Sequence, residues 1–372
     1  MSDKPADNNS EAKELGALRD KIDLIDEQIG ELISQRAQCA QDVAEVKSRY
    51  SDGTMPIFYR PEREAQVLRK AMARNKGPLA NEEFARLFRE IMSACLALEN
   101  PVKVAFLGPE GTFTHEAALK HFGHSAKVTP MAAIDEVFRE VEAGACQFGV
   151  VPVENSTEGV VTHTLDSFMT SNLHICGEVV LRIHHNLMVS DITKTDNISR
   201  IYSHAQSLAQ CRKWLDAHYP KAERVAVTSN AEAAKRMKSE WNAAAIAGET
   251  AAKLYGLSII ADKIEDMPDN STRFLIVGNQ DVGPSGQDKT SIIVSVRNEP
   301  GALHDILEPF HRHGVDLTRV ESRPSRMGTW NYVFFIDFEG HQSNETVAKA
   351  IKDVSSRAAD VKILGSYPKG VL

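Results

Sequence analysis

The sequence predicts a chain of three parts: an all-helical segment, an α/β domain and a small α+β unit. Apolar residues recur at helical spacing from about residue 11 to 99. Short β-rich runs then alternate with helical stretches up to about Gly278, and an order βαββαβ follows from residue 289. At about 100–200 residues per domain, the length of 372 residues suits two or three domains.

Composition excludes several classes of protein. The 42% of hydrophobic residues suffice for globular cores, so we expect neither a disordered nor a fibrous chain. A formal net charge of −8 argues against nucleic acid or anionic membrane as a partner, since both need a basic face. The N-terminus lacks the apolar core of a signal peptide, and the five cysteines form no C-x-x-C pair. We expect a soluble cytoplasmic protein with reduced thiols.

The helical segment, residues 11–100, follows a tail over residues 1–10 that we expect to be disordered. Its apolar stripe predicts a helix over about residues 12–49, about 57 Å long at 1.5 Å per residue. No small monomer buries a stripe of that length, so an antiparallel or intertwined helical dimer is expected. The members of the stripe are Leu15, Leu18, Ile22, Ile25, Ile29 and Leu32.

Two further helices are expected in this segment. Pro61 suits the first turn of the second helix, and Asn75-Lys76-Gly77-Pro78 ends it. Asn81 is expected to cap the third helix. One face of that helix carries Phe84, Phe88, Ile91, Cys95 and Leu98.

Cations interrupt the apolar stripe of the first helix. Arg36 lies four residues after Leu32, Lys47 lies about three turns further, and Arg19 is one turn from Ile22. Unpaired buried charges are costly. The stripe must therefore meet either carboxylates of a partner helix or an anionic ligand.

This segment resembles the all-helical chorismate mutase family, in the arrangement that begins the bifunctional chorismate mutase/prephenate dehydratases. The resemblance rests on Leu18-Arg19-Asp20-Lys21-Ile22-Asp23, Arg36, Lys47, Arg60-Pro61-Glu62-Arg63-Glu64 and the stretch Ser93–Glu99. Some members have Gln at the position of Glu99 and Asp at that of Arg60. The resemblance implies a mutase site lined by Arg19 from the other subunit and by Arg36, Lys47, Arg63, Glu64 and Glu99.

The implied reaction, chorismate to prephenate, is a unimolecular rearrangement of a dicarboxylate. It needs a folded conformer and stabilisation of negative charge on the breaking ether oxygen, without a nucleophile. Arginines suit the carboxylates, and Lys47 offers a point charge to that oxygen. Glu99 can donate to it only when protonated, so we predict that mutase activity falls as pH rises through the pKa of Glu99.

The α/β segment, residues 102–280, opens with a strand over Val104–Leu107 and the glycine-rich turn Gly108–His115. This turn is either a tight structural turn or an anion-binding helix start. The segment contains no dinucleotide fingerprint, P-loop, H-E-x-x-H motif or G-x-S-x-G elbow. We therefore expect no cofactor and no metal.

Three later motifs stand in the order typical of the prephenate dehydratase family. They are Val151–Gly159, Tyr202–Gln206 followed by Gln210, and Asn270–Phe274 with its Thr-Arg-Phe triplet. Each alone fits a polar turn, a helix cap or a hydroxyl-rich loop, but together they resemble that family. A two-lobed domain like the periplasmic binding proteins is then implied.

The resemblance implies that Thr272 donates a proton to the departing ring hydroxyl of prephenate, giving phenylpyruvate, water and carbon dioxide. An alcohol is a poor acid, so Thr272 needs neighbours that orient it. Glu154, Asn155, Ser203 and Gln206 are the candidates, and Arg273 is expected to hold a substrate carboxylate.

The stretch Asp281–Asp288 predicts a linker by composition. Residues 289–367 then predict a ferredoxin-like unit, with strands at 290–296, 315–321, 330–338 and 361–366 and helices at 302–313 and 344–355. Its motifs resemble those of an ACT regulatory domain, although the fold alone would imply no ligand. The resemblance implies that L-phenylalanine binds between paired ACT units, flanked by Gly301, Ala302, Leu303, Glu321, Ser322, Arg323 and Pro324.

We therefore expect a cofactor-free bifunctional enzyme of phenylalanine biosynthesis that is inhibited by phenylalanine and forms a homodimer or higher homo-oligomer. Two alternatives stay open. In one, the helical segment is a degenerate dimerisation module beside an active dehydratase. In the other, the chain is a non-catalytic amino-acid sensor on a binding-protein-like scaffold, which would leave the Thr272 loop unused.

Overall fold

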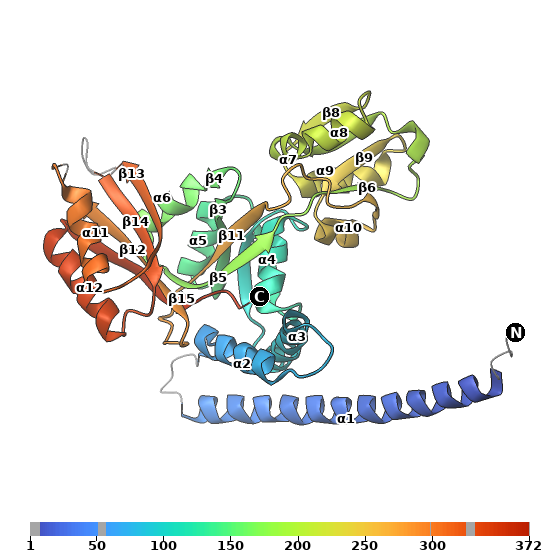
Figure 1. The fold of residues 1–372 in the computed structure, drawn as a ribbon, viewed down its shortest axis with the longest axis horizontal. Helices are drawn as coiled ribbons and strands as arrows, with labels where there is room; N and C mark the ends of the chain where they lie inside the picture. Colours follow the sequence, from blue (N-terminus) through green and yellow to red (C-terminus); the bar gives the residue numbers. More distant parts are fainter. Residues whose placement is uncertain (1–7, 51–56, 298, 325–331, 372) are drawn as a thin grey trace, which may run out of the picture.

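The computed structural model describes residues 8–50, 57–297, 299–324 and 332–371. An N-terminal segment of three helices is followed by a two-lobed α/β domain and then by a C-terminal α+β unit (Figure 1). Within the described residues, no helix combines the length and the apolar character needed to span a membrane.

The first helix, α1 (Asn8–Arg49), is continuous and extends well beyond the rest of the molecule (Figure 1). It starts four residues earlier than predicted, so Asn8–Ser10 of the expected tail are helical. The rest of that tail lies outside the described residues. The apolar stripe is exposed, with Leu18 at 58% and Leu32 at 63%. Among the described residues of one chain, most of the apolar side of α1 is therefore uncovered.

The other helices of this segment are α2 (Pro61–Arg74) and α3 (Asn81–Glu99). The prediction that Asn81 caps α3 is wrong, because Ala80 occupies the cap position. Asn81 instead accepts a hydrogen bond from the Asn75 side chain at 3.0 Å, and Asn75 also donates to Leu79 O at 2.8 Å. Asn75 thus stabilises the turn between α2 and α3. Asn81 is the first residue of α3.

The α/β domain has two lobes. The first is the sheet β2-β1-β3-β11-β5, with β4 beside β3, and the second is the sheet β10-β6-β9-β7-β8. The chain enters the second lobe after β5 and returns after β10, so β11 joins the first sheet from the end of the domain. Predicted strands at β1, β3, β9 and β11 are confirmed. The first lobe contains β1 (Lys103–Leu107), α4 (Phe113–Phe122), β2 (Lys127–Met131), α5 (Ile134–Glu142), β3 (Phe148–Asn155), β4 (Gly159–Val160), α6 (Thr162–Thr170), β5 (His174–Arg182) and β11 (Ser271–Gly278).

The second lobe follows β5 and packs small side chains, chiefly alanines of β9 and of the helix beside it, into its core. Its elements are β6 (Asn186–Val189), β7 (Arg200–His204), α7 (Ala205–Gln210), α8 (Arg212–His218), β8 (Glu223–Val227), α9 (Asn230–Arg236), β9 (Ala243–Ala247), α10 (Glu249–Tyr255) and β10 (Ser258–Ala261).

The C-terminal unit confirms the predicted βαββαβ order, and its four strands form one antiparallel sheet in the order β13-β14-β12-β15. Trp330 and Asn331, expected at the start of the third strand, lie outside the described residues. Its elements are β12 (Asp288–Val296), α11 (Ala302–Arg312), β13 (Leu317–Pro324), β14 (Tyr332–Glu339), α12 (Glu345–Arg357) and β15 (Asp360–Pro368).

The predicted linker is packed rather than free. Arg69 of α2 donates to Ser285 Oγ and to Gln287 O, both at 3.0 Å. Asp288, the last residue of the expected linker, is buried as the first residue of β12, and its carboxylate accepts the Ser285 N–H. The segment therefore fixes the C-terminal unit against the helical segment.

The three parts also share apolar cores. Leu275 and Val277 of the first lobe belong to the same buried cluster as Phe335, Leu364 and Tyr367 of the C-terminal unit. At the other side of the lobe, the ring of Tyr59 packs at 5.4 Å from Phe122 and 5.3 Å from Phe148. The domains are therefore joined by buried contacts and not only by the chain.

Candidate functional sites

A pocket of about 310 Å³ lies where α1, α2 and α3 meet the start of the first lobe. We call it the helical pocket. α1 supplies two of its cations, the N-terminal end of α2 supplies more charge, and the C-terminal end of α3 closes it. Its lining includes five of the six residues expected for the mutase, namely Arg36, Lys47, Arg63, Glu64 and Glu99.

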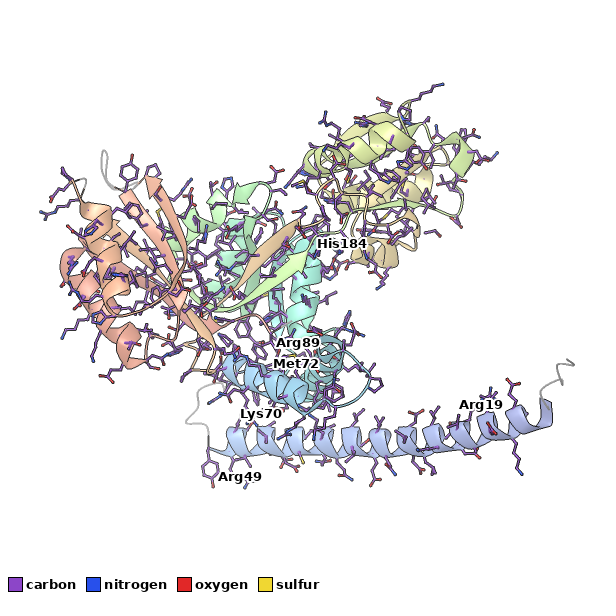
Figure 2. The ribbon with its side chains drawn as sticks, viewed as in Figure 1. Arg19, Arg49, Lys70, Met72, Arg89 and His184 are labelled. Carbon is purple, nitrogen blue, oxygen red and sulfur yellow. The ribbon has the colours of Figure 1, made fainter. Side chains whose placement is uncertain are left out.

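Arg19, the sixth expected residue, does not reach this pocket within one chain. It lies 17 residues before Arg36 on the same helix, a separation of about 25 Å at 1.5 Å per residue. Figure 2 shows it near the free end of α1, far from α2 and α3. A pocket that uses Arg19 needs a second chain.

The helical pocket has a positive character suited to a dianion. Arg36, Lys47, Arg60 and Arg63 line it against the carboxylates of Glu64 and Glu99. Burial lowers the pKa of the Lys47 ammonium although Glu99 opposes this. Burial likewise raises the pKa of the Glu99 carboxyl against the influence of Lys47 and Arg36.

Glu64 is held by a residue that sequence reasoning missed. Arg89 of α3 donates from Nε to Glu64 Oε1 at 3.1 Å and from Nη1 to Lys120 O of α4 at 2.8 Å. Burial raises the pKa of Glu64 even though Arg89 opposes it. The spacing could have indicated this role. Arg89 lies four residues after Ala85 and four before Ser93, so all three share one face of α3, and that face is buried.

A second site lies between the two lobes, as a cleft of about 380 Å³ that we call the interlobe cleft. The glycine-rich turn after β1 lines one part of it, and the end of β3 and the start of β11 line another. The second lobe contributes α7 and the start of α9. Of the residues expected for the dehydratase, Asn155, Gln206 and Thr272 line the cleft.

Backbone amides fix the orientation of the Thr272 hydroxyl. The N–H groups of Thr157 and Glu158 both donate to Asn155 Oδ1 at 3.0 Å, so the Nδ2 group of Asn155 must face the other way. There it donates to Thr272 Oγ1 at 2.8 Å. Among the described residues, Thr272 Oγ1 accepts this bond and has no protein acceptor for its own proton, so that proton can be donated to a group in the cleft.

Three further residues of the cleft are oriented in the same way: Asn270 and Gln210, which the motifs contain without an assigned role, and His185, which sequence reasoning missed. Asn155 also donates to Asn270 Oδ1 at 2.9 Å, so Asn270 Nδ2 donates to Gln210 Oε1 at 3.1 Å. Gln210 Oε1 is therefore an acceptor, and His185 Nε2, 2.8 Å away, must carry the proton. Burial lowers the pKa of His185, which favours this neutral form.

Three expected dehydratase residues lie outside the lining of the cleft. Glu154 pairs with Arg319 of β13 at 3.4 Å, and Arg273 pairs with Glu178 and Asp337. Neighbouring residues of a strand point to opposite faces, so Glu154 and Arg273 face away from Asn155 and Thr272. Ser203 is fully buried beneath the cleft, with its Oγ 2.8 Å from Ile246 O.

The environment of Arg273 is that of a structural ion pair. Burial acts to lower the pKa of its guanidinium, but Tyr367, Asp337 and Glu178 outweigh this and raise it. Arg273 does not line the cleft, and three of its N–H groups bind Glu178, Asp337 and Tyr367. Its expected contact with a substrate carboxylate stays a prediction that this arrangement does not support.

The two motifs expected to flank phenylalanine lie at the same end of the C-terminal sheet. Pro324 of β13 and Val296 of β12 both pair with Tyr332 of β14. Gly301 caps α11 with a φ of 89°, a conformation that favours glycine. Ala302 and Leu303 start α11, and Glu321, Ser322 and Arg323 belong to β13.

A pocket of about 740 Å³ at this end of the sheet is lined by Glu299, Pro300 and Ala302, together with the end of α12. Among the described residues, none of β13 lines it. Arg323 instead donates to Asp166 of α6 at 3.0 Å. In the described part of a single chain, the two motifs therefore do not line this pocket together.

No group of three or more His, Cys, Asp and Glu side chains in the described part of the chain is arranged to hold a metal ion.

Comparisons with known proteins match all three parts. Family models for chorismate mutase type II, prephenate dehydratase and the ACT domain match residues 18–100, 104–282 and 290–356. A bifunctional chorismate mutase/prephenate dehydratase from Pseudomonas aeruginosa is 68% identical over 96% of this chain and 99% of its own length. One from Neisseria gonorrhoeae is 50% identical over 95% of this chain and 97% of its own.

Among solved structures, the prephenate dehydratase from Arthrobacter aurescens in complex with L-Phe is similar to this chain. It has a TM-score of 0.67 and 36% sequence identity, over 72% of this chain and 90% of that one.

Proposed function

Because this chain belongs to the family of bifunctional chorismate mutase/prephenate dehydratases, we propose that the helical pocket is its mutase site and the interlobe cleft its dehydratase site. The chain is an enzyme of L-phenylalanine biosynthesis that rearranges chorismate to prephenate and then converts prephenate to phenylpyruvate. The observation that carries the assignment of the dehydratase site is the direction of the hydrogen bond at Thr272, which leaves a donor for the cleft.

In the helical pocket, Arg36 and Arg63 bind the substrate carboxylates, and Lys47 donates to the ether oxygen. A protonated Glu99 donates to the same oxygen, which the raised pKa of its carboxyl favours. These interactions select the folded conformer and stabilise the charge that develops as the ether bond breaks.

In the interlobe cleft, Thr272 donates its proton to the ring hydroxyl, which leaves as water. The bond to the ring carboxylate breaks at the same time, and its electron pair completes the aromatic ring as carbon dioxide departs. The developing charge on Thr272 Oγ1 is stabilised by Asn155 Nδ2, which lies 2.8 Å away. Gln206 lines the cleft and is available to bind the pyruvyl side chain.

The C-terminal unit, residues 289–367, is proposed as the regulatory domain that binds L-phenylalanine and inhibits the dehydratase. Support comes from the similar enzyme of Arthrobacter aurescens, whose structure is a complex with L-Phe. The binding residues are Gly301, Ala302 and Leu303 of one chain with Glu321, Ser322, Arg323 and Pro324 of its partner. This arrangement is supported by the pocket beside Ala302, which no described residue of β13 of the same chain lines.

A homodimer is proposed for the same chain. The exposed stripe of α1 and the distance of Arg19 from the helical pocket support it, because a second α1 would cover the first and supply an arginine. A cytoplasmic location is also proposed, since all five cysteines are free thiols, as a reducing compartment maintains.

One assay tests the proposed function. Purified protein is given chorismate, and chorismate, prephenate and phenylpyruvate are followed with and without L-phenylalanine. We expect prephenate to appear first, phenylpyruvate to follow, and phenylalanine to suppress the second step. Intact chorismate would favour the degenerate dimerisation module, and absence of phenylpyruvate from added prephenate would favour the amino-acid sensor.

A further inference from the structure

Strands β3 and β11 carry Asn155 and Thr272 of the interlobe cleft. The same two strands also carry one residue each of two ion pairs to the C-terminal unit. β3 and β11 are antiparallel neighbours in which Asn155 lies opposite Thr272 and Glu154 lies opposite Arg273. Asn155 and Thr272 face the cleft. Because side chains alternate along a strand, Glu154 and Arg273 face the other side of the sheet, where the C-terminal unit packs.

Arg273 is bound chiefly by that unit. Its Nη1 donates to Asp337 Oδ2 of β14 at 2.6 Å, and its Nη2 donates to the hydroxyl of Tyr367 of β15 at 2.9 Å. Nε donates to Glu178 of β5 at 2.8 Å. Ser291 of β12 completes the cluster, 2.6 Å from Asp337 Oδ1 and 2.8 Å from the Tyr367 hydroxyl.

Glu154 makes the second connection. Its carboxylate lies 3.4 Å from Arg319 Nε, and the Arg319 side chain is only 10% exposed. Arg319 and Asp337 are themselves paired in register on β13 and β14. β13 binds Glu154 through Arg319, and β14 binds Arg273 through Asp337. These two strands are therefore also paired with each other.

β13 also carries the motif expected to bind phenylalanine. Glu321 follows Arg319 by two residues on the same strand, and Arg323 by four. β13 therefore joins the expected ligand motif to Arg319, and its register with β14 joins Arg319 to Asp337.

We propose that the pairs Arg273–Asp337 and Glu154–Arg319 couple the regulatory domain to the Asn155–Thr272 pair, and that Arg273 and Glu154 are positioning residues of the dehydratase. This inference rests on the proposed inhibition by phenylalanine. Breaking either pair leaves a largely buried charge unpaired, which is costly. β3 and β11 must therefore follow β13 and β14, and the 2.8 Å contact from Asn155 Nδ2 to Thr272 Oγ1 changes with them.

The test uses the full-length enzyme with Asp337→Asn, Arg319→Met and Arg319→Lys. Allosteric coupling typically changes a binding equilibrium by about 5–150-fold. We expect the factor by which saturating L-phenylalanine lowers dehydratase kcat to shrink at least about fivefold in D337N and R319M, while R319K retains most of it. The Kd of L-phenylalanine, measured by calorimetry without prephenate, should stay within about twofold.

Lys349→Gln is the matched control, because Lys349 pairs with Glu345 on the exposed face of α12 in the same domain. It should leave inhibition, basal dehydratase activity and phenylalanine binding unchanged. Chorismate mutase activity and phenylalanine binding report folding in every variant. In D337N and R319M, basal dehydratase kcat should fall with little change in KM, because these substitutions disturb the positioning of Thr272 and not the binding of substrate.

The outcomes separate this inference from the function on which it rests. Full inhibition in both D337N and R319M, with normal phenylalanine binding, overturns the coupling alone. Absence of inhibition in the unmodified enzyme overturns the regulatory function and the coupling with it. Loss of inhibition together with loss of phenylalanine binding would show that these residues serve the ligand site, and this too overturns the coupling.

Discussion

At the scale of single residues, the direction of one hydrogen bond decides what Thr272 can do. The N–H groups of Thr157 and Glu158 leave Asn155 no choice but to donate to Thr272. A threonine held only as a structural donor would have its proton engaged by a protein acceptor. Here the oxygen accepts from Asn155 and has no protein acceptor for its proton among the described residues, which supports the proposed role of Thr272 as proton donor.

Replacing Thr272 with alanine removes this donor. We expect dehydratase kcat to fall by at least about 100-fold, in the range typical for loss of general acid catalysis. Mutase activity should stay near that of the unmodified enzyme, because the helical pocket shares no lining residue with the cleft. Thr272→Ser is the matched control, and it should recover much of the activity. Equal loss of both activities in T272A would indicate misfolding.

Asn155→Asp tests the direction of the same bond. The aspartate keeps the acceptor for the two backbone N–H groups but presents a second acceptor to Thr272. The threonine proton should then turn toward Asp and away from the substrate. We expect kcat to fall about as far as in T272A, measured with prephenate at saturation. Activity similar to that of the unmodified enzyme would contradict this orientation of the Asn155 amide.

We predict that Glu99 makes the mutase activity depend on pH. Burial raises the pKa of its carboxyl, so the protonated form persists to higher pH than for an ordinary glutamate. Mutase activity should decline as pH rises through that pKa, because the ionised carboxylate cannot donate to the ether oxygen. In Glu99→Gln, which donates at every pH, the decline should disappear from the profile of kcat/KM. A flat profile in the unmodified enzyme, unchanged in the variant, would refute this role.

Residue types and motif order sufficed to predict Asn155, Gln206 and Thr272 as residues of one cleft. Arg273 and Glu154, which were carried over from the motif as a block, do not line that cleft, and their expected roles at the substrate stay predictions. Period-2 alternation already requires neighbours in a strand to face opposite sides. Arg89 was missed for a different reason, since its partner Glu64 lies on another helix, 25 residues away.

At the scale of elements, the regular patterns were predicted well and the irregular segments were not. The 3.6-residue period predicted α1, and β-rich runs predicted β1, β3 and β11. The segment Asp281–Asp288 has the composition of a free linker, yet Arg69 binds it from more than 200 residues away in the sequence. Contacts of such long range leave no local pattern.

Helix α1 leads to a test of subunit sharing. If Arg19 completes the partner's helical pocket, Arg19→Ala and Lys47→Met are each inactive as mutases, but a mixed dimer contains one pocket with both residues intact. Random exchange of subunits in an equal mixture should restore about a quarter of the unmodified activity, because half of the dimers are mixed and each has one intact pocket.

Subunits are exchanged by joint unfolding and refolding, or by co-expression. R19A mixed with itself is the control and should stay inactive. A mixture of R19A and K47M that remains inactive, while forming mixed dimers by mass, would show that both residues serve the same chain's pocket.

At the scale of the whole molecule, the dehydratase and the regulatory domain are one packed body. Phe335, Leu364 and Tyr367 are buried in the same cluster as Leu275 and Val277 of β11. Removing the regulatory domain therefore does more than remove an inhibitor site. It exposes the back of the strand that carries Thr272 and leaves Arg273 without Asp337 and Tyr367.

A chain truncated after Gln287 should consequently lose phenylalanine inhibition and also part of its dehydratase activity. Burying one large apolar side chain contributes about 1.5–3 kcal/mol, and a whole domain is stable by only about 5–15 kcal/mol. We expect a lower Tm for the truncated protein and a reduced dehydratase kcat, with mutase activity less affected because α1, α2 and α3 remain. An uninhibited fragment with undiminished Tm and dehydratase kcat would show that the shared core is dispensable, and that the regulatory domain acts on Thr272 only when phenylalanine is bound.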